Sequence, residues 1–83
     1  MRTQESIEEL EELERIMLAS SLAEKLCFRV SAFVTWTQQK NFTISQLCEM
    51  SRKIHSEALI GEQDYSSKVL IAFVNNLPFE DFN

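Results

Sequence analysis

The sequence has few of the residues that interrupt helices. Among its 83 residues there are one glycine, one proline and one histidine. Glycine and proline are the strongest markers of turns, so their scarcity indicates a few helices joined by short loops. Hydrophobic residues make up 45% of the chain and charged residues 25%, as in ordinary globular proteins. The length and composition together predict a single helical domain spanning residues 1–83.

The sequence also lacks a recognisable arrangement of metal-binding or catalytic residues. Its two cysteines, Cys27 and Cys48, are 21 residues apart and form no CxxC pair, the spacing typical of zinc sites. The one histidine, His55, lies two helical turns beyond Cys48, too far for a direct hydrogen bond on one helix. We therefore expect no enzyme activity, no metal and no cofactor, and we interpret both cysteines as buried or half-buried thiols.

Neither a leader peptide nor a membrane span is expected. Residues 1–15 are acidic, whereas a signal peptide begins with basic residues followed by an apolar stretch. Residues 16–36 form the most apolar long segment, but Glu24, Lys25 and Arg29 lie near its middle. These features predict a cytoplasmic protein.

The net charge of −5 is unevenly distributed along the chain. Residues 1–15 contain six glutamates and two arginines, residues 16–55 carry a net charge of +3, and residues 56–83 carry −4. The overall sign disfavours a generic nucleic-acid binder, which has a basic surface. The distribution fits either a mixed solvated surface or two faces with different partners.

The longest helical pattern covers residues 6–38. Ser6 and Glu9 have the S-x-x-E spacing of a capping box, so residues 1–5 are expected to be frayed. An acidic first segment carries apolar side chains at spacings of three, three and four, as in a short coiled coil. We call this stripe the N-terminal seam, and it consists of Ile7, Leu10, Leu13 and Met17.

The second part of this long helix is more apolar. Residues 22–36 are hydrophobic around most of the helical circumference, which predicts the central element of the core. Small residues at Ala19–Ser21 leave two possibilities open. The helix continues through them, or it bends there and folds the N-terminal seam back onto the body.

Two further helices are predicted. Thr43 and Gln46 form a second capping box, and the apolar periodicity then runs to Leu59, with Gly61 just beyond. A third helix starts near Asp64 and ends before Pro78, which cannot continue it. A strand over residues 67–74 is the alternative, but the sequence offers no second strand to pair with it. An acidic aromatic tail, residues 78–83, follows.

These elements predict an all-α fold of three helices with a long N-terminal helix, packed as a small bundle that dimerisation completes. A helix of 33 residues would be about 50 Å long, and the two shorter helices would cover only about half of it. The N-terminal seam would then have no partner within the chain, and an exposed seam of this kind marks a protein contact.

We therefore predict a non-catalytic protein–protein interaction module. It would be a small acidic cytosolic regulator, adaptor or inhibitor that binds itself in a homodimer, or another protein, through helix–helix contacts. Phe79 and Phe82 in the tail are predicted as further partner contacts. The alternative for these two aromatics is that they close the end of the core.

The alternative function is a nucleic-acid-associated regulator. Residues 43–60 resemble the start of a helix-turn-helix segment, and four nearby basic side chains would make the contacts: Lys40, Arg52, Lys53 and His55. However, the apolar periodicity runs unbroken through residues 52–54, where the tight turn of such a motif would lie. The acidic total also opposes this interpretation.

Overall fold

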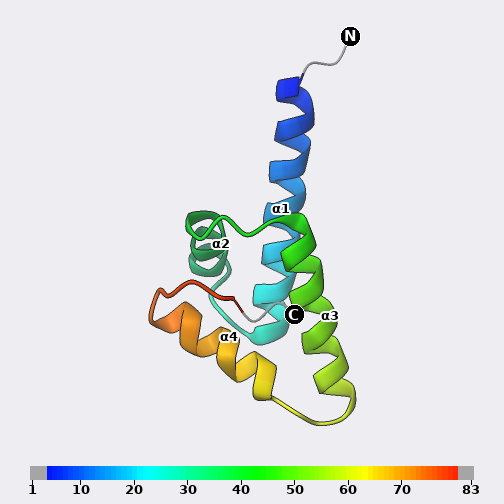
Figure 1. Ribbon diagram of the computed structural model, residues 1–83, viewed down its shortest axis with the longest axis vertical. Coiled ribbons are helices and arrows are strands. Elements are labelled where there is room, and N and C mark those ends of the chain that lie inside the picture. Colours follow the sequence, from blue (N-terminus) through cyan, green and yellow to red (C-terminus); the bar gives the residue numbers. More distant parts are fainter. Residues whose placement is uncertain (1–3, 81–83) are drawn as a thin grey trace.

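The computed structural model describes residues 4–80, and those residues form helices, turns and loops without a strand. Four helices follow one another in this part of the chain: α1 (Gln4–Leu26), α2 (Val30–Gln39), α3 (Ile44–Leu59) and α4 (Asp64–Val74). The predicted all-α class is therefore confirmed for the described residues. Helices α2 and α3 pack against α1, and α4 packs against α3 at the far end (Figure 1).

The molecule is elongated because half of α1 extends beyond the other helices. Its principal extents are 48 × 26 × 22 Å. The buried residues of α1 lie between Ala19 and Ala23, whereas residues 7–14 are all exposed. The N-terminal half of α1 therefore projects as a rod from a compact four-helix body (Figure 1).

The predicted single helix over residues 6–38 is wrong, because the chain forms two helices there. The break lies at Cys27–Arg29, and α1 runs without interruption through Ala19–Ser21, the position where a bend had been considered. Cys27 has a φ of 61°, in the left-handed region that ends a helix. The prediction of three helices is wrong for the same reason, since this break adds a fourth.

All four described helices end with the same backbone motif. In the turn that follows each helix, a single residue has a positive φ. These residues are Cys27, Asn41, Gly61 and Asn76. The next residue donates its backbone N–H to the carbonyl five residues earlier, over 2.8 to 3.0 Å. This is the Schellman arrangement, in which glycine and asparagine are the usual left-handed residues. Cys27 is the exception, which explains why the first break could not be recognised from the residue types.

The other helix boundaries agree in part with the prediction. Helix α3 has the predicted bounds, and both hydrogen bonds of the capping box are present. The Gln46 backbone N–H donates to the Thr43 hydroxyl oxygen, and the Thr43 backbone N–H donates to the Gln46 side-chain carbonyl. Helix α1 begins at Gln4, so the predicted N-cap position Ser6 lies inside its first turn. Helix α4 ends at Val74, before the predicted limit, because the chain turns left-handed at Asn76.

Helix α4 begins without a cap from its own N-cap residue, Gln63. The Glu57 carboxylate on α3 takes that role. It accepts the backbone N–H of Tyr65 at 2.7 and 2.8 Å and that of Ser66 at 3.2 Å. A negative charge is favourable at a helix N-terminus, so Glu57 joins the end of α3 to the start of α4.

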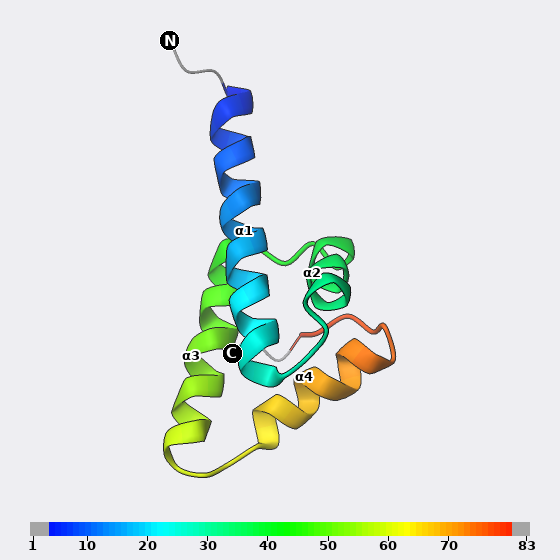
Figure 2. The same cartoon turned by 180° about the vertical axis from the view of Figure 1, so that it is seen from behind.

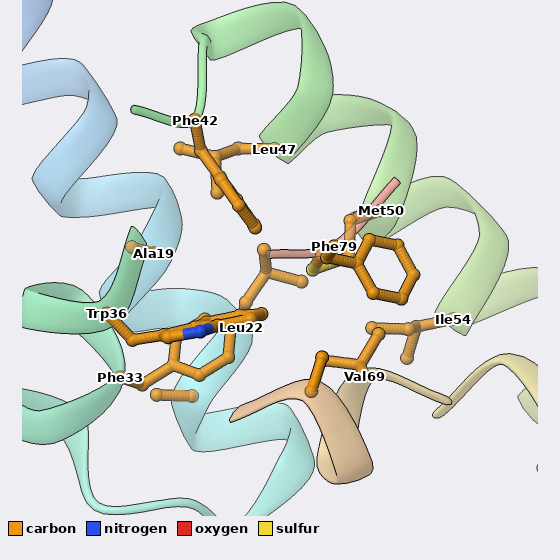
Figure 3. Packing of buried hydrophobic residues seen from close by; sticks show 12 residues of the cluster. Ala19, Leu22, Phe33, Trp36, Phe42, Leu47, Met50, Ile54, Val69 and Phe79 are labelled. Carbon is orange, nitrogen blue, oxygen red and sulfur yellow. The ribbon is translucent and has the colours of Figure 1, made fainter. Parts of the chain in front are cut away.

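The hydrophobic core lies where the C-terminal half of α1 meets the other three helices (Figure 3). Its buried members are Ala19, Leu22, Ala23, Phe33, Trp36, Phe42, Leu47, Met50, Ile54, Val69, Ala72 and Phe79. Aromatic rings connect the helices, with the centroids of Phe33 and Trp36 each within 5.7 Å of that of Phe73. The indole Nε1 of Trp36 donates to the carbonyl of Leu77 at 2.9 Å, which fastens the chain after α4 to α2.

Candidate protein interface

The N-terminal seam is exposed over its whole length. The exposed fractions are 47% for Ile7, 63% for Leu10, 53% for Leu13 and 63% for Met17. A soluble chain rarely leaves several large aliphatic side chains together on one helix face unless they form a binding surface. The seam extends about 15 Å along the helix axis.

The seam faces away from the body of the molecule. Residues of an α-helix are about 100° apart around its axis, which places the centre of the seam roughly opposite the side of α1 that packs against the core. That core-facing side carries Ala19, Leu22, Ala23 and Leu26. Seen from behind, α1 runs in front of α3 and no other helix crosses it (Figure 2). A helix bound to the seam would therefore not meet α2 or α3.

One carboxylate lies within the seam itself. Glu14 is one helical turn beyond Leu10 and three residues before Met17, so it shares their face of α1. Its side chain is exposed. The apolar surface of the seam thus surrounds a single acidic group.

The two edges of the seam are also acidic. Helical spacing places the exposed side chains of Glu9 and Glu11 about 100° to either side of the seam centre, and these two residues form its acidic flanks. Glu8 and Glu12 are exposed as well, but they lie on the opposite side of α1, where Glu12 and Arg15 line a hollow together with the segment between α2 and α3. The surface is therefore a short aliphatic stripe with a glutamate at each edge.

The predicted contact at Phe79 is contradicted by the structure. Phe79 is 7% exposed and its ring lies edge-on to Tyr65 at a centroid distance of 5.5 Å. The hydrogen bond from the Trp36 indole to the carbonyl of Leu77 holds the chain just before Phe79 against α2. Phe79 therefore closes the end of the core, which was the alternative prediction for this residue. Phe82, the other predicted tail contact, lies outside the described residues.

The basic residues of the nucleic-acid alternative lie on two elements, three of them on α3 and Lys40 at the end of α2. Arg52 pairs with Glu49 on its own helix, and the Nζ of Lys53 lies 5.3 Å from the centre of the Tyr65 ring. Lys40 is the C-cap residue of α2, and His55 is exposed. Helix α3 is continuous through residues 52–54, without the turn of a helix-turn-helix motif. Nucleic-acid binding stays a prediction.

The sequence interpretation missed a second exposed apolar face, on α4. The exposed fractions are 43% for Leu70, 58% for Ile71 and 67% for Val74. The sequence analysis did not divide this helix into a core-facing side and an exposed side, because the segment is hydrophobic almost throughout. Helical spacing does separate these three from the core-facing Val69 and Ala72, and this signal was available.

Two other clusters involve ionisable or reactive side chains. Carboxylate oxygens of Glu57, Glu62 and Asp64 lie within 4.8 Å of one another, but Glu57 already caps α4. Cys27 and Cys48 are both exposed free thiols, so the expectation that they are buried or half-buried is wrong. Cys27 is exposed because it occupies the turn after α1, and Cys48 because it points away from the core face of α3.

A hollow of about 480 Å³ opens between the ends of α1, α3 and α4. Its apolar lining comes from Leu26, Phe28, Ile54, Ala58 and Leu70. Its polar lining comes from three elements: Lys25 of α1, Glu62 and Gln63 of the loop between α3 and α4, and Ser66 and Ser67 of α4. These groups form no arrangement that selects a ligand class.

Within the described residues, no helix combines the length and apolarity needed to cross a membrane. Searches against models of protein families, curated proteins and solved structures found no match to the chain.

Proposed function

We propose that this protein is a non-catalytic protein-binding module that packs a partner helix against the N-terminal seam. It would act in the cytoplasm as a small acidic regulator, adaptor or inhibitor. One observation carries the proposal: four large aliphatic side chains lie exposed on one face of α1, on the side away from the core. Recognition would be of the helix-to-helix kind, in which residues three and four apart insert between those of the partner.

The size of the seam limits how strongly it alone can bind. Complete burial of one large aliphatic side chain stabilises by about 1.5–3 kcal/mol, and the seam residues are already about half buried. Their combined contribution is therefore roughly 3–6 kcal/mol, while association costs about 4–15 kcal/mol in lost freedom. A stable complex needs a partner that adds contacts beyond the four aliphatic residues.

The test replaces two central seam residues together, Leu10→Glu with Leu13→Glu. We expect the double variant to lose capture of a partner protein, or to show a lower mass in light scattering if the chain self-associates. Both side chains are more than half exposed, so the unfolding midpoint in urea should stay within about 0.5 kcal/mol of the parent. A variant that is monomeric like its parent and binds the same partners equally well would exclude the proposal.

The matched control is Ile71→Glu on α4. Ile71 is 58% exposed, similar to Leu13, but it lies on a different helix and outside the seam. We expect this variant to bind like the parent chain. Equal losses in the control and in the double seam variant would point to a general effect of added charge.

A further inference from the structure

We infer that the N-terminal seam binds an amphipathic helix of another protein that presents lysine or arginine to Glu14, and that a second copy of this chain does not occupy it. The inference rests on the proposed function and specifies its partner. The observation behind it is the acidic group within the aliphatic stripe, together with the acidic flanks of the same segment.

The spacing of the seam shows where Glu14 lies in a helix pair. Positions 7, 10, 14 and 17 have the three–four–three spacing of residues that face the partner in a two-helix coiled coil. Three of these positions hold Ile7, Leu10 and Met17, and the fourth holds Glu14, with Leu13 beside it. A partner helix packed on the seam therefore covers the Glu14 carboxylate.

A second copy of the chain, bound to the seam, would offer no favourable partner to the Glu14 carboxylate. In a parallel pair the two Glu14 side chains would face each other, and in an antiparallel pair each would face aliphatic or glutamate side chains of the other copy. A carboxylate removed from water without a cation or hydrogen-bond donor is strongly destabilising. The glutamates on both flanks would add repulsion between the two copies.

A basic helix satisfies the same geometry. A lysine or arginine opposite Glu14 would neutralise the covered carboxylate, and further basic residues would face the acidic flanks. Opposite charges across an interface speed association and exclude partners of the wrong sign. Arg15, the basic residue nearest to Glu14 along the helix, does not fill this role, because it lies outside the seam beside Glu12.

The exposed face of α1 continues past the seam and also suits a longer partner. Ser21 and Glu24 are exposed on the same side of the helix, and the small serine leaves room for close approach. Glu24 is ten residues beyond Glu14, or about 15 Å along the axis. The partner helix should therefore carry two basic side chains separated by about ten residues.

The first test compares two synthetic helical peptides of about three heptads, each with leucine at the positions that face the aliphatic residues of the seam. One carries lysine at the position opposite Glu14 and at the flanking positions, and the other carries glutamate at those same positions. Binding to the full 83-residue chain is measured by fluorescence anisotropy, at peptide concentrations where each peptide alone is monomeric. We expect the lysine peptide to bind at least tenfold more tightly, with an affinity that falls as salt is added. Equal binding of the two peptides would overturn the inference.

The second test changes Glu14 itself. Glu14→Leu completes the aliphatic stripe, so we expect this variant to self-associate in light scattering and to lose its preference for the lysine peptide. Glu14→Gln removes the charge with little change in shape and should reduce the preference without producing a strong dimer. A Glu14→Leu variant with the mass and peptide preference of the parent would contradict the role given to Glu14.

The outcomes separate this inference from the proposed function. If the parent chain is already a dimer, and Leu10→Glu with Leu13→Glu converts it to a monomer, the seam is an interface but its occupant is a second copy. That result overturns the inference and leaves the proposed function standing. A monomeric parent chain that binds neither peptide overturns both.

Discussion

Cys27 adopts a backbone conformation that residues other than glycine and asparagine rarely adopt. Its φ of 61° permits the Schellman motif that ends α1 and turns the chain toward α2. For a residue with a β-carbon, the left-handed conformation costs roughly 1–2 kcal/mol. The other three helices end at Asn41, Gly61 and Asn76, which bear this conformation more easily.

Replacement of this residue by glycine should therefore stabilise the protein. Glycine removes the steric cost but adds about 0.5–1 kcal/mol of chain entropy to be lost on folding, so we expect a gain of about 0.5–1 kcal/mol for Cys27→Gly in urea unfolding. The control is Cys27→Ala, which keeps the β-carbon and should be close to the parent. A glycine variant less stable than the alanine variant would contradict this account.

The same residue explains why the first helix boundary could not be predicted. Sequence patterns locate a helix end by glycine, asparagine or proline, and Cys27-Phe28-Arg29 contains none of them. The apolar character also continues on both sides of the break. The left-handed turn at Cys27 is held by its surroundings, since Phe28 packs against the core rings of Phe33 and Phe73.

At the scale of a single element, α4 shows how a helix depends on its neighbour. Its first free N–H groups are accepted by Glu57, eight and nine residues earlier in the chain. The sequence predicted only that the helix starts near Asp64, and capping residues usually stand next to the helix they cap. Only the packing of α3 against α4 brings the Glu57 carboxylate to that position.

Removal of this cap should weaken α4 in particular. We expect Glu57→Ala to lower the free energy of unfolding by about 1–2 kcal/mol, because two backbone N–H groups lose a charged acceptor at a helix N-terminus. Glu62→Ala is the matched control, since Glu62 is an exposed glutamate in the adjacent loop. Urea unfolding followed by circular dichroism makes the comparison, and equal effects of the two substitutions would contradict the capping role.

Helix α3 is the element that the sequence predicted best. Its start is marked by the reciprocal Thr43–Gln46 cap and its end by Gly61, so both boundaries are encoded within a few residues of where they occur. The N-terminal seam was likewise visible as a periodic pattern. The spacing also places Glu14 on the face of the seam, but the structure is needed to show that this face lies on the side of α1 away from the core.

At the scale of the whole molecule, the segment after α4 closes the core. Phe79 is buried near Met50 and Ile54 of α3, as Figure 3 shows, and the carbonyl of Leu77 accepts the indole N–H of Trp36. The path of this segment depends on contacts with helices far away in the sequence. The local sequence pattern is therefore compatible both with Phe79 binding a partner and with Phe79 packing into the core, and it does not distinguish the two.

Removal of the Phe79 side chain from the core should lower the stability of the entire fold. We expect Phe79→Ala to lower the free energy of unfolding by about 3–5 kcal/mol, because it leaves a cavity in a small core. Glu80→Ala is the control, since Glu80 is the exposed next residue and its loss should change stability by less than about 0.5 kcal/mol. Thermal and urea unfolding check the pair, and a Phe79→Ala variant as stable as the parent would exclude a core role for this residue.

Because α1 is continuous, the direction in which the seam faces around the helix axis is fixed relative to the body of the protein. One residue inserted between Met17 and Ala19 would rotate the seam by about 100° around the helix axis and swing a bound helix toward α2 or α3. Four inserted residues would rotate it by only about 40° and move it outward by about 6 Å. The number of residues between the seam and the core therefore determines how a bound partner is oriented relative to the body of the protein.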